Sequence, residues 1–146
     1  MIRKGTKGFT LIEIMIAVAL ITAIGALALF VSMDFYRSYN LDAEMETIIS
    51  LITRVRGRAV NNIDASSHGL YIDESSMTLF RGESYLLRNE DLDEVFPRSR
   101  AFEIEGLNEI VFDQLTGEAS ATGTIAISGQ GRTATIEINH EGRIDW

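Results

Sequence analysis

Twenty consecutive uncharged residues, 14–33, constrain this chain more than any other feature of its sequence. At about 1.5 Å per residue, a helix of this length reaches about 30 Å, which matches the hydrocarbon core of a bilayer. A carboxylate, Glu13, directly precedes the run, and three cations, Arg3, Lys4 and Lys7, lie before it. A charge inside a span costs about 3 kcal/mol on insertion scales, so Glu13 is a functional-site hypothesis. The ordinary alternative is a carboxylate that reaches the lipid headgroups.

The cations predict the orientation of the span. Three Lys or Arg residues precede it, and only Arg37 lies within the first twenty residues after it. By the positive-inside tendency, the N-terminus is cytoplasmic and the residues beyond about 34 lie outside. We therefore expect a single-pass membrane protein with an exported C-terminal domain.

The residues around Glu13 resemble a known processing signal. The string Lys-Gly-Phe-Thr-Leu-Ile-Glu, residues 7–13, follows a short basic leader and runs into the apolar segment. This arrangement resembles the class III signal of type IV pilins and type II secretion pseudopilins. The resemblance implies that a prepilin peptidase cuts between Gly8 and Phe9 and N-methylates Phe9, and that Glu13 is the acidic residue of the family.

Two simpler interpretations of the N-terminus explain less. An ordinary secretory signal has a shorter apolar stretch that ends in a small-residue cleavage site, and residues 34–37 do not provide one. A plain single-pass anchor fits the length and the flanking charges equally well. It leaves Gly8 and Glu13 unexplained.

The resemblance also implies a mechanism of filament assembly. Subunits wait in the membrane, and a platform protein and an ATPase move them into a helical filament. In the family the acidic residue, here Glu13, meets the N-terminal amine of a neighbouring subunit, here that of Phe9. An α-amino group is largely protonated at neutral pH, and opposite charges attract strongly in a poorly hydrated core. The implied partners are prepilin peptidase, other pilin or pseudopilin subunits, the platform protein, the ATPase and membrane lipid. The resemblance also implies that the membrane is the bacterial inner membrane, with a periplasmic or extracellular C-terminal domain.

The acidic composition limits the partners of the exported domain. The chain has a formal charge of −8, and loss of residues 1–8 would change it to −11, because three cations and no acids would be removed. An acidic surface repels phosphates, so we expect no broad nucleic-acid-binding face. The chain has no cysteine, so its stability depends on burial rather than on disulfides.

Helical spacing continues beyond the span. The apolar residues recur at steps of three and four, at Leu41, Met45, Ile48, Ile49, Ile52, Val55 and Ala59. No proline interrupts residues 9–60, so the pattern predicts one helix from about residue 9 to about residue 58. Residues 9–33 would form the transmembrane and filament-core half, and residues 34–60 the amphipathic half. The alternative is two helices that break near residues 38–40, where Ser and Asn compete for backbone hydrogen bonds.

After a polar loop at residues 61–67 the apolar period changes to two, which is typical of strands. The predicted strands are 69–73, 77–81, 84–88, 101–105, 109–113, 123–128, 132–139 and 143–146. Short turns between them, such as Gly129-Gln130-Gly131, indicate antiparallel pairing. The predicted fold class is α+β: the long helix packs its second half on an antiparallel sheet or small β-sandwich formed by residues 61–146.

The exported domain resembles the H-type minor pseudopilins of type II secretion. The matching stretches are residues 52–62, which are rich in arginine, residues 110–119 and residues 141–146. The resemblance implies a structural minor pilin-like subunit of a type II secretion pseudopilus or of a type IV pilus.

The alternative function is a binding module that the same anchor places at a filament tip, where it engages DNA, an exoprotein or a surface. Clustering of Tyr71, Phe80 and Tyr85 with an arginine would favour this alternative.

Other residue constellations give weaker hypotheses. His68 and His140 would need a chance meeting with Ser66 or Ser67 to form a hydrolytic triad, so they are predicted to be surface polar residues. The acidic stretch 89–94 offers oxygens to Ca²⁺ but lacks the glycine and the spacing of an EF-hand, which favours a solvated loop.

Two further assignments complete the predictions. Arg54, Arg56 and Arg58 are expected to cap the helix C-terminus rather than to recognise acidic groups, and Trp146 is expected to dock on the sheet. We predict no catalytic residue, no metal site and no cofactor, and hence no enzyme.

Overall fold

The computed structural model describes residues 8–146 and, within them, every side chain except those of residues 30–37. Most of the predicted leader, residues 1–7, therefore lies outside the described residues. The chain forms two compact units, Met1–Arg37 and Ser38–Trp146. The helix α1 spans Leu11–Val60 and passes residues 38–40 without interruption, so the two-helix alternative is wrong.

The second unit contains two antiparallel sheets of four strands each. The first has the order β3-β2-β1-β5, with β1 at His68–Ile72, β2 at Ser76–Arg81, β3 at Glu94–Pro97 and β5 at Glu109–Phe112. The second has the order β4-β6-β7-β8, with β4 at Glu103–Gly106, β6 at Gly123–Gly129, β7 at Arg132–Ile138 and β8 at Ile144–Asp145. Short 3-10 helices lie at Ile63–Ala65 (η1), Tyr85–Leu87 (η2) and Glu90–Leu92 (η3).

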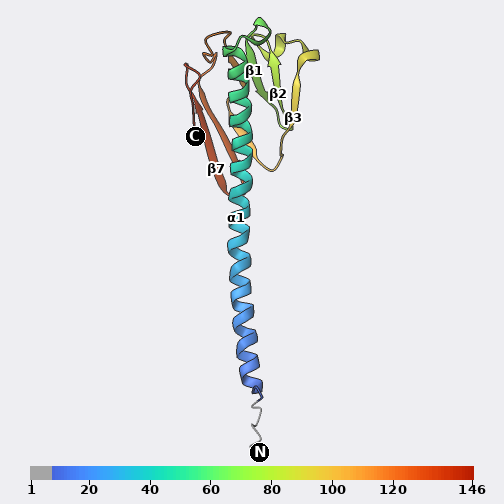
Figure 1. The fold of residues 1–146 in the computed structure, drawn as a ribbon, viewed down its shortest axis with the longest axis vertical. Helices are drawn as coiled ribbons and strands as arrows, with labels where there is room; N and C mark the ends of the chain where they lie inside the picture. Colours follow the sequence, from blue (N-terminus) through green and yellow to red (C-terminus); the bar gives the residue numbers. More distant parts are fainter. Residues whose placement is uncertain (1–7) are drawn as a thin grey trace, which may run out of the picture. The chain divides into compact units, whose positions relative to one another are not determined.

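The second half of α1 supplies one wall of a single core. Within the second unit, Figure 1 shows this part of α1 crossing in front of the sheets, with β1, β2 and β3 to one side and β7 to the other. The buried helix residues are Leu41, Ile48, Leu51, Ile52, Val55 and Ala59. They share a core with Leu70 and Ile110 of the first sheet and with Ile125 and Ile136 of the second. The predicted α+β fold is confirmed, and Leu51 joins the predicted helix face.

The β6–β7 hairpin confirms the predicted turn at residues 129–131. Gly129 pairs with Arg132 across the hairpin. Gln130 and Gly131 between them both have positive φ, 54° and 81°. Two consecutive residues with positive φ match the right-handed twist of the flanking strands, which explains why the chain reverses within two residues.

The predicted strand at residues 84–88 is wrong. Gly82 has a φ of 124°, and the chain then forms η2 at Tyr85–Leu87. The Arg88 side chain holds this turn, because its Nη1 donates to the Tyr85 carbonyl at 2.6 Å. The first sheet instead takes β3 from residues that were not predicted as a strand, and Pro97 is tolerated there because β3 is an edge strand.

A buried ion pair joins α1 to the segment between β3 and β4. Arg98 Nε lies 3.9 Å from Glu44 Oε1, and the two side chains are only 5% and 13% exposed. The Arg98 guanidinium also donates to the carbonyls of Asp73 at 2.8 Å and Phe102 at 2.5 Å. Burial raises the pKa of the Glu44 carboxyl above its ordinary value of 4.5, although the Arg98 charge acts in the opposite direction.

We expect the substitution Glu44→Gln to change how stability depends on pH. A raised pKa means that the folded protein holds the Glu44 proton more tightly than the unfolded chain, so Glu44 loses its stabilising contribution as pH rises from 4.5 through the folded-state pKa. The wild-type protein should therefore lose stability relative to Glu44→Gln over that range. Thermal unfolding of the full chain in detergent, from acidic to neutral pH, measures the difference. A pH-independent difference, or one of opposite sign, would contradict the assignment.

Candidate functional site

A hydrogen-bonded cap closes the first turn of α1 around Glu13. Glu13 Oε2 accepts from the Thr10 backbone N–H and from the Thr10 hydroxyl, both at 2.8 Å. The Glu13 backbone N–H donates in turn to Thr10 Oγ1 at 3.3 Å. This is a capping box, in which residues three apart satisfy each other's free backbone donors. Glu13 therefore has a local structural role in addition to any role toward a neighbour.

Thr10 is a site residue that the sequence interpretation missed. The spacing Thr10-x-x-Glu13 directly before an apolar helix is the usual sequence pattern of a capping box, so the signal was present. Both hydrogen bonds from Thr10 go to Oε2, and within residues 8–146 no hydrogen bond reaches Glu13 Oε1. The second carboxylate oxygen is thus available to another donor.

Gly8 and Phe9 lie just ahead of the helix, in exposed chain. Residues 8–10 have no regular secondary structure, and the Phe9 side chain is 83% exposed. A Cβ built on Gly8 meets nothing within 4 Å. Both sides of the 8–9 peptide bond are therefore accessible, as a peptidase substrate requires.

The first part of α1 is long and apolar enough to cross a membrane. The segment Leu11–Leu29 has a mean hydropathy of 2.5, and none of it is buried. Its exposed large side chains include Leu20, Ile24 and Leu27. An exposed helix that is apolar on all sides is stable in lipid or against other apolar helices, not in water. These features are consistent with a single-pass membrane-anchored protein.

The arginines near the end of α1 bind β3 and two loops of the second unit. Arg54 and Arg58 both contact the Glu94 carboxylate, at 2.8 Å and 2.5 Å. Arg56 donates to the carbonyls of Gly117 at 3.2 Å and Glu141 at 3.1 Å. Arg58 lies in the last turn of α1, as the dipole argument predicted, but the described hydrogen bonds of Arg56 and Arg58 go to other segments and not to carbonyls of the helix end.

Other groups satisfy the last carbonyls of the helix. The Asn61 side chain donates to the Gly57 carbonyl at 2.7 Å. The Leu115 backbone N–H donates to the Ala59 carbonyl at 3.0 Å. The helix end is thus closed by one local side chain and by one loop that is distant in sequence.

His68 is buried rather than a surface residue. It is 4% exposed, and its Nε2 lies 2.9 Å from the Ile63 carbonyl oxygen. The Ser66 hydroxyl donates to the Ser67 carbonyl, and the His140 ring contacts the Ala119 carbonyl. The described hydrogen bonds of both histidines therefore go to backbone oxygens and not to a serine hydroxyl.

The acidic stretch 89–94 is tied to arginines rather than solvated throughout. Asp93 accepts from Arg88 Nε at 2.7 Å and is 10% exposed. Glu94 is held by Arg54 and Arg58. Within residues 8–146 no group of three or more His, Cys, Asp or Glu side chains is arranged to hold a metal ion.

The aromatic residues singled out in the sequence do cluster with an arginine. The Tyr71 and Tyr85 rings stack with centroids 3.8 Å apart, and the Phe80 ring meets Tyr85 edge-on at 5.7 Å. The Arg88 guanidinium lies 3.6 Å from the centroid of the Tyr85 ring. The cluster joins β1 and β2 to the loop that follows β2.

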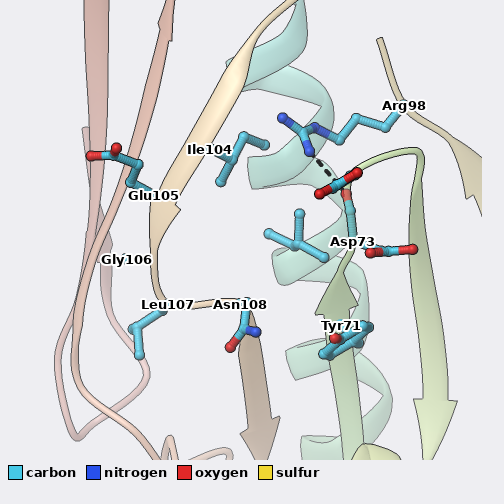
Figure 2. Close-up of a pocket in the computed structure, with 10 residues that line it drawn as sticks. Tyr71, Asp73, Arg98, Ile104, Glu105, Gly106, Leu107 and Asn108 are labelled. Atoms are coloured by element: carbon cyan, nitrogen blue, oxygen red, sulfur yellow. Dashed lines mark hydrogen bonds between the residues drawn. The ribbon is translucent and has the colours of Figure 1, made fainter. Parts of the chain in front are cut away.

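A cavity of about 230 Å³ opens between the ends of β1 and β4. Figure 2 shows Tyr71 and Asp73 on one side, Ile104 and Leu107 on the other, and Arg98 reaching the Asp73 backbone. The Arg98 hydrogen bonds described above go to the protein's own carbonyls. The cavity is therefore a gap between the two sheets, and the Arg98 side chain crosses it to bind backbone carbonyls of the protein itself.

Trp146 is 72% exposed, so the prediction that it docks on the sheet is wrong. The β8 strand that precedes it is only two residues long and pairs with Glu137 and Ile138. The Trp146 ring therefore lies outside the core, whereas Ile136 and Ile138 of the neighbouring strand β7 are buried in it.

One known family matches the N-terminal segment. Residues 3–29 match the family model of the prokaryotic N-terminal methylation motif. The match includes Gly8, Phe9, Thr10 and Glu13 and the whole apolar segment Leu11–Leu29. No solved structure matches the chain.

Proposed function

From the premise that residues 3–29 carry the N-terminal motif of type IV pilins and pseudopilins, we propose that this protein is a structural minor pilin-like subunit. It is assembled into a type II secretion pseudopilus or a type IV pilus. The observation that carries the proposal is the combination of this motif with an exposed apolar helix and a folded second unit. Members of this family are processed by prepilin peptidase and are generally structural rather than enzymatic.

Processing removes residues 1–8 and leaves Phe9 as the methylated N-terminus. The accessible chain at residues 8–10, directly before the first helical turn, supports this proposal. Cleavage there removes the basic leader and keeps the capping box of Thr10 and Glu13 intact. The mature protein therefore begins one residue before its own helix cap.

Assembly pairs Glu13 of one subunit with the amine of Phe9 of the next. The capping box uses Glu13 Oε2, and no hydrogen bond to Oε1 is present within residues 8–146, which supports this pairing. The apolar surface of Leu11–Leu29 passes from lipid to neighbouring helices of the same kind. The platform protein and ATPase of the machine supply the work of extraction. The N-terminus faces the cytoplasm and the second unit lies outside.

The H-type subtype is part of this proposal. Two antiparallel sheets that pack on the second half of α1 support this assignment. The arginines of residues 54–58 support it as well, because they bind this helix to Glu94, Gly117 and Glu141. Gene neighbours would separate the two machines, since secretin and exoprotein components indicate secretion and retraction components indicate a pilus.

The filament-tip binding module is the second candidate function. The cluster of Tyr71, Phe80 and Tyr85 with Arg88 favours it. The Arg88 charge is bound by Asp93, however, and the chain is acidic overall. A protein or surface ligand therefore suits the cluster better than DNA does.

The proposed function predicts the mass of the mature protein. We expect the chain purified from membranes of its native host to begin at Phe9 and to carry one additional methyl group on its α-amine. We also expect it in the sheared fibre fraction, together with other subunits of the same machine. Intact-mass and N-terminal peptide spectrometry measure the first result. A native chain that retains residues 1–8 without methylation would overturn the proposal.

A further inference from the structure

The loop between β2 and β3, residues 82–93, presents two adjacent leucines to solvent. Leu86 and Leu87 are 89% and 82% exposed, and both belong to η2. Burial of an apolar side chain is favourable roughly in proportion to the apolar area that it removes from water. A loop that was free to rearrange would therefore tend to bury both leucines. Their exposure indicates that other contacts hold the loop in its present conformation.

An aromatic and cationic stack holds the loop in this conformation. The Tyr85 ring is sandwiched between the Tyr71 ring on β1, at 3.8 Å, and the Arg88 guanidinium, at 3.6 Å. Stacked aromatic rings, and a cation over the face of a ring, attract each other beyond the effect of their buried area. Tyr85 thus faces the sheet, and the two residues that follow it face away.

Hydrogen bonds fix the same conformation at three further points. The Tyr85 backbone N–H donates to Glu109 Oε1 of β5 at 2.8 Å. Arg88 Nε donates to Asp93 Oδ2 at 2.7 Å, and Arg88 Nη1 donates to the Tyr85 carbonyl at 2.6 Å. Asp93 is 10% exposed, so this ion pair is well shielded from water. The leucines are therefore displayed by a fixed turn.

The charge around the leucines is negative. Glu83, Glu90 and Asp91 are exposed carboxylates within a few residues of Leu86 and Leu87. The only cation of the loop, Arg88, has a side chain that is 13% exposed and is bound to Asp93. An apolar tip with an acidic rim is complementary to an apolar pocket with a basic rim, and it is repelled by anionic lipid and by nucleic acid.

We propose that residues 82–93 form a docking loop whose Leu86 and Leu87 enter an apolar, basic-rimmed pocket on a partner protein. Exposed apolar groups rimmed by polar residues are typical of protein interfaces, and a pre-organised loop loses little conformational entropy on binding. The inference goes beyond the proposed function, since it requires neither cleavage of the leader nor entry into a filament. Neither result of the processing experiment decides it.

Photocrosslinking of the full chain in its native host tests the docking loop. The variant Leu87→p-benzoylphenylalanine places the photoreactive ring at the tip, and the same substitution at Leu115, which is 62% exposed on another turn, is the matched control. We expect a crosslink from position 87 that is absent from position 115. Mass spectrometry of the crosslinked peptide should find apolar residues with Lys or Arg beside them on the partner. Crosslinks only to lipid, only to a second copy of this chain, or to no protein would overturn the proposal.

Charge and shape variants make the test specific. With the probe at position 86, Leu87→Asp should reduce the crosslink at least tenfold, and Asp91→Arg should reduce it as well, whereas Leu115→Asp should leave it unchanged. Tyr85→Ala removes the stacked ring and should reduce the crosslink although both leucine positions are still exposed. Leu86 and Leu87 contribute little to the core, so thermal unfolding should be unchanged in the tip variants. A crosslink that survives Leu87→Asp and Asp91→Arg would rule out the proposed pocket chemistry.

Discussion

The substitution Gly8→Leu should leave residues 1–8 attached and prevent release of a chain that begins at Phe9. A peptidase that cuts after glycine has no room for a branched side chain beside the scissile bond. One excess methylene in an enzyme pocket reduces the specificity constant by about 10–200-fold, and leucine adds more than one. We therefore expect at least a hundredfold loss of processing, measured as gel mobility and intact mass of the full chain.

The structure separates this effect from a defect of folding. A Cβ on Gly8 meets nothing within 4 Å, and Gly8 lies outside α1, so the larger side chain disturbs no contact among the described residues. Gly25 offers the matched control, because a Cβ there also meets nothing within 4 Å, but within the apolar helix. Gly25→Leu should be processed normally. Normal processing of Gly8→Leu would show that cleavage occurs elsewhere or not at all.

The helix and its buried face could be predicted because their signal is local. Apolar residues three and four apart share one side of a helix whatever they pack against. Leu41, Ile48, Ile52, Val55 and Ala59 are accordingly all buried. Leu51 lies beside this stripe and is buried as well, because two sheets cover a wider arc of the helix than a single sheet would.

The loop after β2 could not be predicted from the same kind of signal. Residues 84–88 contain a short apolar run, Tyr85 to Leu87, which is compatible with a strand. In the structure, however, Tyr85 stacks on Tyr71 and Arg88 folds back over it. The contact between Tyr71 of β1 and Tyr85 joins residues more than ten positions apart, so no local pattern contains it. The strand β3 was missed for the same reason, since its edge position is set by pairing with β2 and not by its own composition.

The roles of the charged residues also depended on distant partners. Arg54 and Arg58 were correctly placed on the last turns of the helix, but their partner Glu94 lies 36 residues or more further along the chain. The N-terminal site differs, because Gly8, Phe9 and Glu13 were located by a short motif and the capping box joins residues only three apart. The sequence interpretation did not include the cap that Thr10 and Glu13 form, in which Oε2 of Glu13 is the acceptor.

We expect Glu13→Ala to be cleaved normally but to fail to enter filaments. Two unit charges 4 Å apart attract by about 4 kcal/mol at an effective dielectric constant of 20, whereas loss of a helix cap costs about 1 kcal/mol. The charge on Glu13 should therefore matter more for assembly than its cap does. The measurement is the ratio of processed chain in the sheared fibre fraction to processed chain left in the membrane.

Two further variants distinguish the charge from the cap. Glu13→Gln keeps an oxygen that accepts from Thr10 but removes the charge, and Thr10→Ala removes the hydroxyl of the cap but keeps the carboxylate. If the Phe9 amine of the neighbour is the partner, Glu13→Gln should be as defective as Glu13→Ala, and Thr10→Ala should assemble at a reduced level. The reverse order, with Thr10→Ala defective and Glu13→Gln assembling, would show that Glu13 acts only by capping its own helix. In that case the free Oε1 would have no role in assembly, and the register of subunits would have to come from the apolar surface of Leu11–Leu29.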